Sequence, residues 1–215
     1  MTTLSILVVG LLLGMKHATE ADHLAAVATL ATRQTSLAQT LRQGLAWGVG
    51  HTLTLMLFGG VVFVLGHSIS PATERALETA VGVMLVLLGA DLLRRVLHER
   101  LAPPKPAAPG SAWPVRALAV GAMHGLAGSA ALVVLSLQDL PSVALGLGYI
   151  AVFGVGSLLG MAVLSVVIAM PLRLSAHRLV RLHRSMTALV GAFSIGLGLT
   201  LVVRLGALHG LYPVA

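Results

Sequence analysis

Six long apolar stretches divide the sequence, and they constrain the fold more than any other feature. They cover residues 3–32, 42–67, 76–97, 115–137, 142–170 and 185–208. A helix needs about 20 apolar residues to cross the hydrocarbon core of a membrane, and each stretch reaches that length. Charged residues make up only 10% of the chain, whereas soluble domains carry about 25%. The sequence therefore predicts an all-α polytopic membrane protein with about six transmembrane helices.

The distribution of Lys and Arg predicts how these helices are oriented. With six spans, the breaks near 32–42, 94–116 and 173–184 share one side of the membrane. That side receives Arg33, Arg42, Arg94, Arg95, Arg100, Lys105, Arg116, Arg173, Arg178, Arg181 and Arg184, and the other side receives Arg75 and Arg204. Basic residues favour the cytoplasmic side, so we expect a cytoplasmic-membrane protein with both termini outside. No base-reading or stacking cluster accompanies these charges, so we expect no nucleic-acid partner.

A cleaved secretory signal peptide is an alternative interpretation of the first apolar stretch. The segment 4–13 resembles the apolar core of such a peptide, but no Lys or Arg precedes it. Cleavage would also discard or strand the most polar motif of the chain. The sequence contains no cysteine, which excludes disulfide scaffolds and thiolate metal sites.

The two halves of the chain repeat each other at an offset of about 107 residues. The matching positions are Gly48-Val49-Gly50-His51 with Gly154-Val155-Gly156-Ser157, His17 with His124, and Val81-Gly82, Gly89 and Arg95 with Val190-Gly191, Gly198 and Arg204. Three helices per half is an odd number, so the halves should have opposite orientations, as in inverted-repeat transporters whose sites lie near the midplane. We expect a first repeat at 1–97, a Pro-rich cytoplasmic linker at 98–114 and a second repeat at 115–215.

The densest group of ionisable side chains within the apolar stretches is residues 16–23, Lys-His-Ala-Thr-Glu-Ala-Asp-His. A charged side chain at the bilayer centre costs about 2.5–3.5 kcal/mol, so this group must line a cavity, form ion pairs or bind an ion. Imidazole with carboxylate is typical of Zn, Ni, Co or Fe(II) sites rather than Mg or Ca sites. A self-neutralising pair between Lys16 and Glu20 is the alternative, but it leaves Asp22, His17 and His23 unexplained.

An ideal helix would point these side chains in different directions. Either the helix unwinds near Gly14, or other helices contribute ligands. The distances in sequence to flanking Arg residues place His23, His51 and His124 about 12–15 Å above the basic side, with His17 about 9 Å farther out. A lone histidine in an apolar helix is usually a packing residue, but three at one depth from different helices predict a shared polar site.

These motifs resemble the signature of the nickel/cobalt transporter family, which reads His-Ala-x-Asp-Ala-Asp-His. The chain has His-Ala-Thr-Glu-Ala-Asp-His at 17–23, Gly-His-Thr at 50–52 and Met-His-Gly-Leu-Ala-Gly-Ser-Ala at 123–130, the last resembling the urease- and hydrogenase-accessory branch of nickel permeases. The resemblance implies a permease that transports Ni²⁺ or Co²⁺ as its substrate, without a tightly bound cofactor. It also implies that His17, Asp22, His23 and His51 recognise the metal.

The chain departs from the family pattern in three ways. Glu20 replaces the usual Asp, about six helices replace the eight of many members, and no His-rich loop is present. The direction of transport is therefore open, as import or efflux. With the resemblance and the depth argument combined, the predicted metal site comprises His17, Glu20, Asp22, His23, His51 and His124.

Two other functional classes fit parts of the pattern. Glu20 and His23 form Glu-x-x-His, half of a di-iron signature, but Glu78 is the only other glutamate in an apolar stretch and His-Glu-x-x-His is absent. We therefore predict that the chain is not an enzyme. An exporter of amino acids or small anions would favour embedded Arg over clustered His and Asp. Four Gly-x3-Gly pairs permit a homo-oligomer without establishing one.

Overall fold

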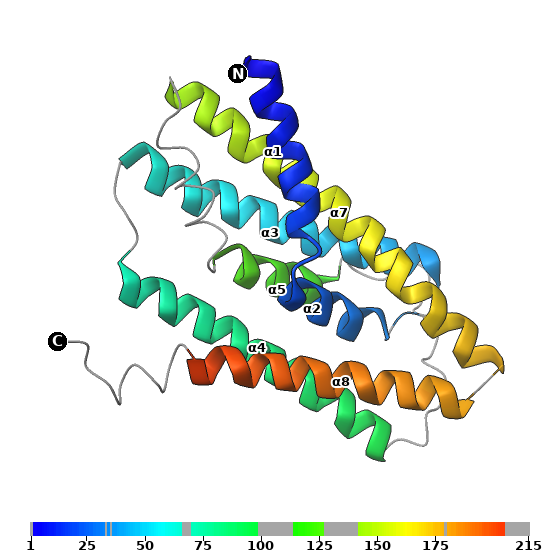
Figure 1. Cartoon of the computed structure of the whole chain (residues 1–215). Coiled ribbons are helices and arrows are strands. Elements are labelled where there is room, and N and C mark those ends of the chain that lie inside the picture. Colours follow the sequence, from blue (N-terminus) through cyan, green and yellow to red (C-terminus); the bar gives the residue numbers. More distant parts are fainter. Residues whose placement is uncertain are drawn as a thin grey trace.

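The computed structural model describes residues 2–32, 34, 36–65, 70–98, 114–126, 142–178 and 180–204. These residues form helices and no strand, which confirms the all-α prediction for this part of the chain (Figure 1). The helices are α1 (Thr3–His17), α2 (Ala21–Ala31), α3 (Leu37–Leu65), α4 (Pro71–His98), α5 (Val115–Leu126), α7 (Val143–Arg178) and α8 (Val180–Val202). The predicted linker at 98–114 lies almost entirely outside the described residues.

Four of the described helices, α3, α4, α7 and α8, are long and apolar enough to cross a membrane. The stretch 3–32, for which unwinding near Gly14 was one of two possibilities, forms α1 and α2, which are bent by 57° and together make a fifth candidate span. Helix α5 has 12 residues, too few to cross a bilayer at 1.5 Å per residue. The described residues thus support four or five of the six predicted spans.

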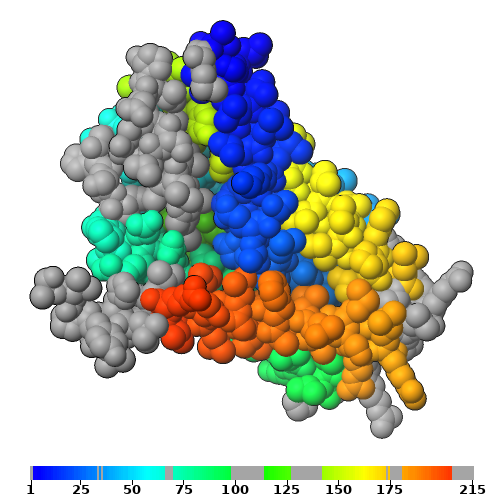
Figure 2. Space-filling view, viewed as in Figure 1, coloured from blue at the N-terminus to red at the C-terminus, as the bar shows by residue number. Residues whose placement is uncertain are grey.

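Large apolar side chains are exposed along the outside of the long helices, of which α7 and α8 cross the face shown in Figure 2. Leu57 on α3, Leu87 on α4 and Leu189 on α8 each leave about two thirds of their surface uncovered (70%, 65% and 69%). Exposed apolar surface of this extent is rare on soluble monomers. It fits helices whose outer faces contact lipid.

Helix ends assigned to the basic side by sequence lie at one end of the molecule. The starts of α3 and α8 and the ends of α2, α4 and α7 all gather on the right of Figure 1. The end of α3 and the starts of α4 and α7 lie on the left. The basic residues of these described helix ends therefore lie at one end of the bundle.

Two helix pairs, α1 with α7 and α5 with α3, pack through equivalent glycine contacts. A Cβ added at Gly14 of α1 would overlap the carbonyl oxygen of Phe153, and one added at Gly121 of α5 would overlap that of Trp47. The offset of about 107 residues relates Gly14 to Gly121 and Phe153 to Trp47. Each pair also has a glycine on the opposite helix. A Cβ added at Gly156 of α7 would overlap the carbonyl oxygen of Leu11, and one added at Gly50 of α3 would overlap that of Leu118.

Helices α4 and α8 also pack through glycines that match in the repeat. A Cβ at Gly82 would lie 2.8 Å from the carbonyl oxygen of Gly198, and one at Gly89 would lie 2.6 Å from that of Gly191. The repeat pairs Gly82 with Gly191 and Gly89 with Gly198, so each contact is the counterpart of the other. Gly14, Gly82 and their partners thus serve contacts within the chain, where small residues allow helix backbones to approach closely.

The close approach of α5 and α3 leads to a stability prediction. Gly121→Ala should destabilise the protein, because its Cβ would displace the Trp47 backbone, and overpacking typically costs about 1–3 kcal/mol. The matched control is Gly196→Ala on α8, since nothing lies within 4 Å of a Cβ there. Thermal unfolding in detergent measures both. Equal melting temperatures for Gly121→Ala and the parent protein would contradict the packing described.

Candidate metal centre

The polar motif lies at a break between two helices. Helix α1 ends at His17 and α2 begins at Ala21, and the Thr19 and Glu20 N–H groups donate to the carbonyl oxygens of Lys16 and His17 at 2.9 and 3.0 Å. Glu20 is extended, with φ −64° and ψ 150°, and this residue turns the chain into α2. The sequence suggested unwinding near Gly14, but that residue lies within α1, where it packs against α7.

This break brings four histidine rings from four helices together. The ring of His23 lies 4.4 Å from that of His17, 5.2 Å from that of His51 and 4.9 Å from that of His124, between centroids. All four side chains are buried. The expected 9 Å separation of His17 from the others is wrong, because it assumed that α1 continues straight into α2.

Three of these rings have an oxygen acceptor against Nδ1. The Nδ1 atoms of His17 and His23 lie 2.9 Å from carboxylate oxygens of Glu20 and Asp22, and that of His124 lies 3.2 Å from the carbonyl oxygen of Val120. Because these oxygens accept, Nδ1 is the donor, and a neutral ring then carries its lone pair on Nε2. In metal sites, such bonds fix the orientation of the ligating imidazole.

The lone pairs that remain have no partner among the described residues. The Nε2 atoms of His17, His23 and His124 and both ring nitrogens of His51 are buried without a hydrogen bond. Leaving buried polar atoms unsatisfied costs about 1–3 kcal/mol each, so their accumulation in one place calls for a ligand. A divalent cation that accepts several lone pairs at once satisfies one nitrogen of each ring, and the N–H group of His51 is left without a hydrogen bond among the described residues.

The ligand atoms fall into two groups that share His23. One group contains His17, His23 and His51, the other contains Asp22, His23 and His124, and within each group the atoms lie within 4.8 Å of one another. Asp22 uses Oδ1 to accept from His23, and its Oδ2 lies 3.9 Å from Nε2 of His124. Imidazole with carboxylate is a donor set for Zn, Ni, Co or Fe(II).

Glu20 lies at the edge of the cluster. Its side chain is 53% exposed, it belongs to neither group of ligand atoms, and its carboxylate contacts His17 rather than Lys16. The alternative Lys16–Glu20 pair is therefore not formed in the structure. Glu78 also belongs to neither group, so the described residues assemble no second glutamate of a di-iron site.

The helix termini complete the electrostatics of the cluster. His17 and His124, which match in the repeat, each occupy the last turn of a short helix, α1 and α5. Helix C-termini carry partial negative charge, which favours a cation. The opposing positive N-terminus of α2 is offset by Asp22 in its first turn.

Two buried residues were not predicted from the sequence: Trp47, which contacts the cluster, and Ser157, which packs against Gly14 one helical turn before His17. The ring of Trp47 lies 5.3 Å from that of His23 and 5.5 Å from that of His124. Ser157 is fully buried with an unpartnered hydroxyl. Signals for both exist in the sequence, because Trp47 precedes His51 by one helical turn and Ser157 matches His51 in the repeat.

Comparison with known proteins assigns the chain to a family. It is 37% identical over 220 residues to urease accessory protein UreH of Bacillus sp. (strain TB-90), an alignment that covers 98% of this chain and 96% of the relative. The chain belongs to the UreH family. No family model matches this UreH-family chain, and no solved structure gives a significant match. The family is one of urease accessory proteins, so the prediction that the chain is not an enzyme is confirmed.

Two plant proteins are more distant relatives of this UreH-family chain. They are Chloroplast protein FOR GROWTH AND FERTILITY 1 and 2 of Arabidopsis thaliana, each 26% identical to it. The alignments cover 90% and 85% of this chain but only 58% and 51% of the relatives. The chain thus spans little more than half the length of these plant proteins.

Proposed function

We propose that this UreH-family protein is a membrane permease for a divalent transition-metal ion, nickel or cobalt. The observation that carries the proposal is the convergence of four buried imidazoles with unpartnered nitrogens at a break between two apolar helices. Kinship with a urease accessory protein supports nickel as the cargo, because urease is a nickel enzyme. Import and efflux are both compatible with this site.

The chemistry of the cluster favours a cation over an amino acid or a small anion. It presents the lone pairs of buried imidazole rings together with the carboxylate of Asp22, which is 28% exposed. The C-termini of α1 and α5 add partial negative charge. An anion would meet repulsion from Asp22, so the exporter alternative fits less well.

Each predicted residue takes a role in this proposal. His17, His23, His51 and His124 bind the ion through their free ring nitrogens. Asp22 orients His23 through Oδ1 and offers Oδ2 to the ion. Glu20 was predicted as a ligand, but its contact with Nδ1 of His17 favours a positioning role.

We propose that the spans form an inverted repeat in the cytoplasmic membrane, with both termini outside. The paired glycine contacts between α1 and α7, between α5 and α3 and within α4–α8 support this arrangement, because each has a counterpart at the repeat offset. The stretch 115–137, whose first part is α5, remains a prediction and would complete the six spans. The site then lies between the two repeats, as in other transporters of this plan.

Single-cysteine labelling tests this topology, and the chain offers no native cysteine to interfere. Thr73→Cys, at the start of α4, should react with an impermeant thiol reagent only from outside. Ala107→Cys, in the predicted linker, should react only from the cytoplasmic side. Reaction of both from the same side would contradict the inverted repeat, because an even number of crossings would then separate them.

The permease itself is tested by flux in proteoliposomes. The purified protein should carry Ni²⁺ or Co²⁺ across the bilayer with saturable kinetics, and it should discriminate against Mn²⁺, which prefers oxygen donors. Empty liposomes supply the background, and Zn²⁺ serves as a third borderline cation. Absence of metal flux above background, with intact fold by circular dichroism, would refute the proposal.

A further inference from the structure

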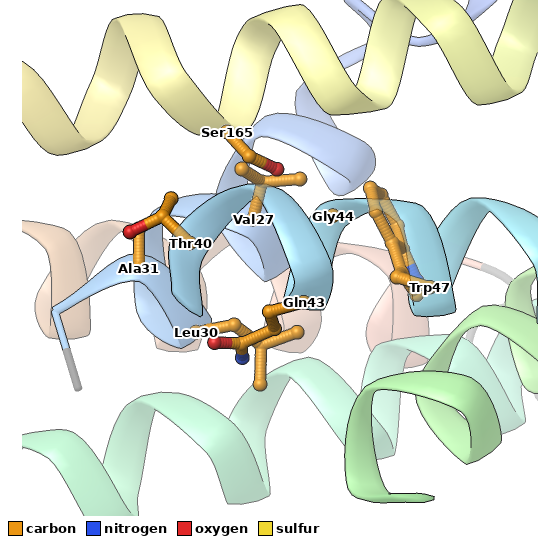
Figure 3. A pocket seen from close by; sticks show the side chains of 8 residues that line it. All are labelled: Val27, Leu30, Ala31, Thr40, Gln43, Gly44, Trp47 and Ser165. Atoms are coloured by element: carbon orange, nitrogen blue, oxygen red, sulfur yellow. The ribbon is translucent and has the colours of Figure 1, made fainter. Parts of the chain in front are cut away.

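A small cavity lies between α2, α3 and α7, beside the histidine cluster (Figure 3). It is lined by Val27, Leu30, Ala31, Thr40, Gln43, Gly44, Trp47 and Ser165. Ala31 is the last residue of α2, and Thr40 lies in the first turn of α3. The cavity is therefore at the end of the bundle where basic residues concentrate, on the side of the cluster nearest that end.

Polar groups line this cavity in an otherwise apolar interior. The Oε1 atom of Gln43 is buried without a hydrogen bond. The hydroxyls of Thr40 and Ser165 donate to carbonyl oxygens of their own helices at 3.1 and 2.7 Å, which leaves their oxygen lone pairs available. Figure 3 shows these side chains reaching the cavity from α3 and α7.

Helix α3 connects the cavity to the cluster along one face. Gln43, Trp47 and His51 are spaced by four residues, so they lie above one another, and Gln43 is about 12 Å from His51 along the axis. Trp47 stands between them. Its indole lines the cavity and also contacts the rings of His23 and His124.

We propose that this cavity is the path by which the transported cation passes between the histidine cluster and the basic end of the bundle, with the Trp47 indole as the barrier between the two. The inference rests on the proposed permease function. Amide and hydroxyl oxygens, here those of Gln43, Thr40 and Ser165, are weaker ligands than imidazole for nickel or cobalt. An ion that leaves the cluster can therefore contact these oxygens in passing without being trapped by them. The cavity has room for only about one water molecule, so it must widen for an ion to pass.

The test uses Gln43→Cys in the cysteine-free chain, assayed in oriented membrane vesicles. A small cationic, impermeant methanethiosulfonate reagent should modify this cysteine from the side that also labels Ala107→Cys, and metal flux should fall at least tenfold relative to the same variant before treatment. The matched control is Leu53→Cys, on the same helix and within the apolar stretch but 54% exposed on the outer surface of α3. It should neither react nor lose flux, because a thiol in lipid does not form the reactive thiolate.

The barrier is tested by the reactivity of His51→Cys from the same side. It should be unreactive with Trp47 present and should react at least tenfold faster in combination with Trp47→Ala. Should Gln43→Cys fail to fold, Ser165→Cys probes the same cavity from α7. Metal flux that is unaffected by reagent at both cavity positions overturns the path and leaves the permease standing, whereas absence of flux in the untreated parent chain overturns the permease and the path together.

Discussion

Replacing His23 with alanine is expected to lower the affinity for Ni²⁺ or Co²⁺ by about 100-fold or more. His23 belongs to both groups of ligand atoms and its ring contacts those of the three other histidines in the cluster. Loss of a residue that merely supports a metal ligand typically costs about 10–100-fold in affinity, and His23 is proposed as a ligand itself. Calorimetric titration of the purified protein in detergent measures the change.

The matched control for His23 is His183→Ala. The ring of His183 contacts the carbonyl oxygen of Leu172, on α7, and it belongs to neither group of ligand atoms. Its loss should leave metal affinity unchanged. His51→Ala and His124→Ala should each weaken metal binding less than His23→Ala, because each removes a ligand from only one group, with expression and insertion near normal. Wild-type metal affinity in His23→Ala would show that the histidine cluster is not the metal-binding site.

Asp22→Asn is expected to reduce metal affinity by about tenfold or more. The substitution is nearly isosteric, so packing should survive, but it removes the negative charge and replaces a strong oxygen ligand with a weak one. Oδ1 of Asp22 accepts from both the backbone N–H and Nδ1 of His23 at 2.9 Å. An amide oxygen is a poorer acceptor for these two bonds, so the ring orientation that presents Nε2 to the ion is weakened as well.

Glu20→Gln is the comparison that ranks the two carboxylates. Its effect should be smaller, because Glu20 is more than half exposed and an amide oxygen can still lie against Nδ1 of His17. Thermal stability of both variants serves as the control for folding. A larger loss in Glu20→Gln than in Asp22→Asn would reverse the proposed roles, and unchanged affinity in both would favour a structural role for the whole motif.

Much of the arrangement follows from the sequence. Apolar length predicted α3, α4, α7 and α8, and counting from flanking Arg residues predicted that His23, His51 and His124 lie together, which the structure shows. Depth along a helix is a simple function of sequence when the helix is straight. Each of these three histidines lies within an uninterrupted helix, so counting residues from the flanking Arg gave its depth correctly.

The break at residues 18–20 could not be predicted because nothing local requires it. The segment Ala18-Thr19-Glu20 contains neither Gly nor Pro, the residues that usually interrupt helices. The nearby glycine, Gly14, misled the prediction, since it serves close packing against Phe153. The break is stabilised by contacts that form only in the folded protein, including the contact between Nδ1 of His17 and the carboxylate of Glu20.

The role of Gln43, and the ring contacts that Trp47 makes, also required the structure. An aromatic or amide side chain in an apolar helix is most often a packing residue, and neither belongs to the family signature. Both residues matter because of neighbours on other helices. Trp47 contacts the rings of His23 and His124, and Gln43 lines a cavity whose other walls come from α2 and α7. Such contacts between helices distant in sequence are not encoded in any local pattern.

X-ray absorption spectroscopy of the Ni²⁺-loaded protein in detergent, compared with His23→Ala, tests whether buried imidazoles in the middle of the bundle bind the transported ion. We expect about one nickel ion per chain, with the multiple-scattering pattern of at least three imidazole ligands, and loss of that signal in His23→Ala. A nickel ion coordinated only by oxygen, or an imidazole signal that is unchanged in His23→Ala, would contradict it.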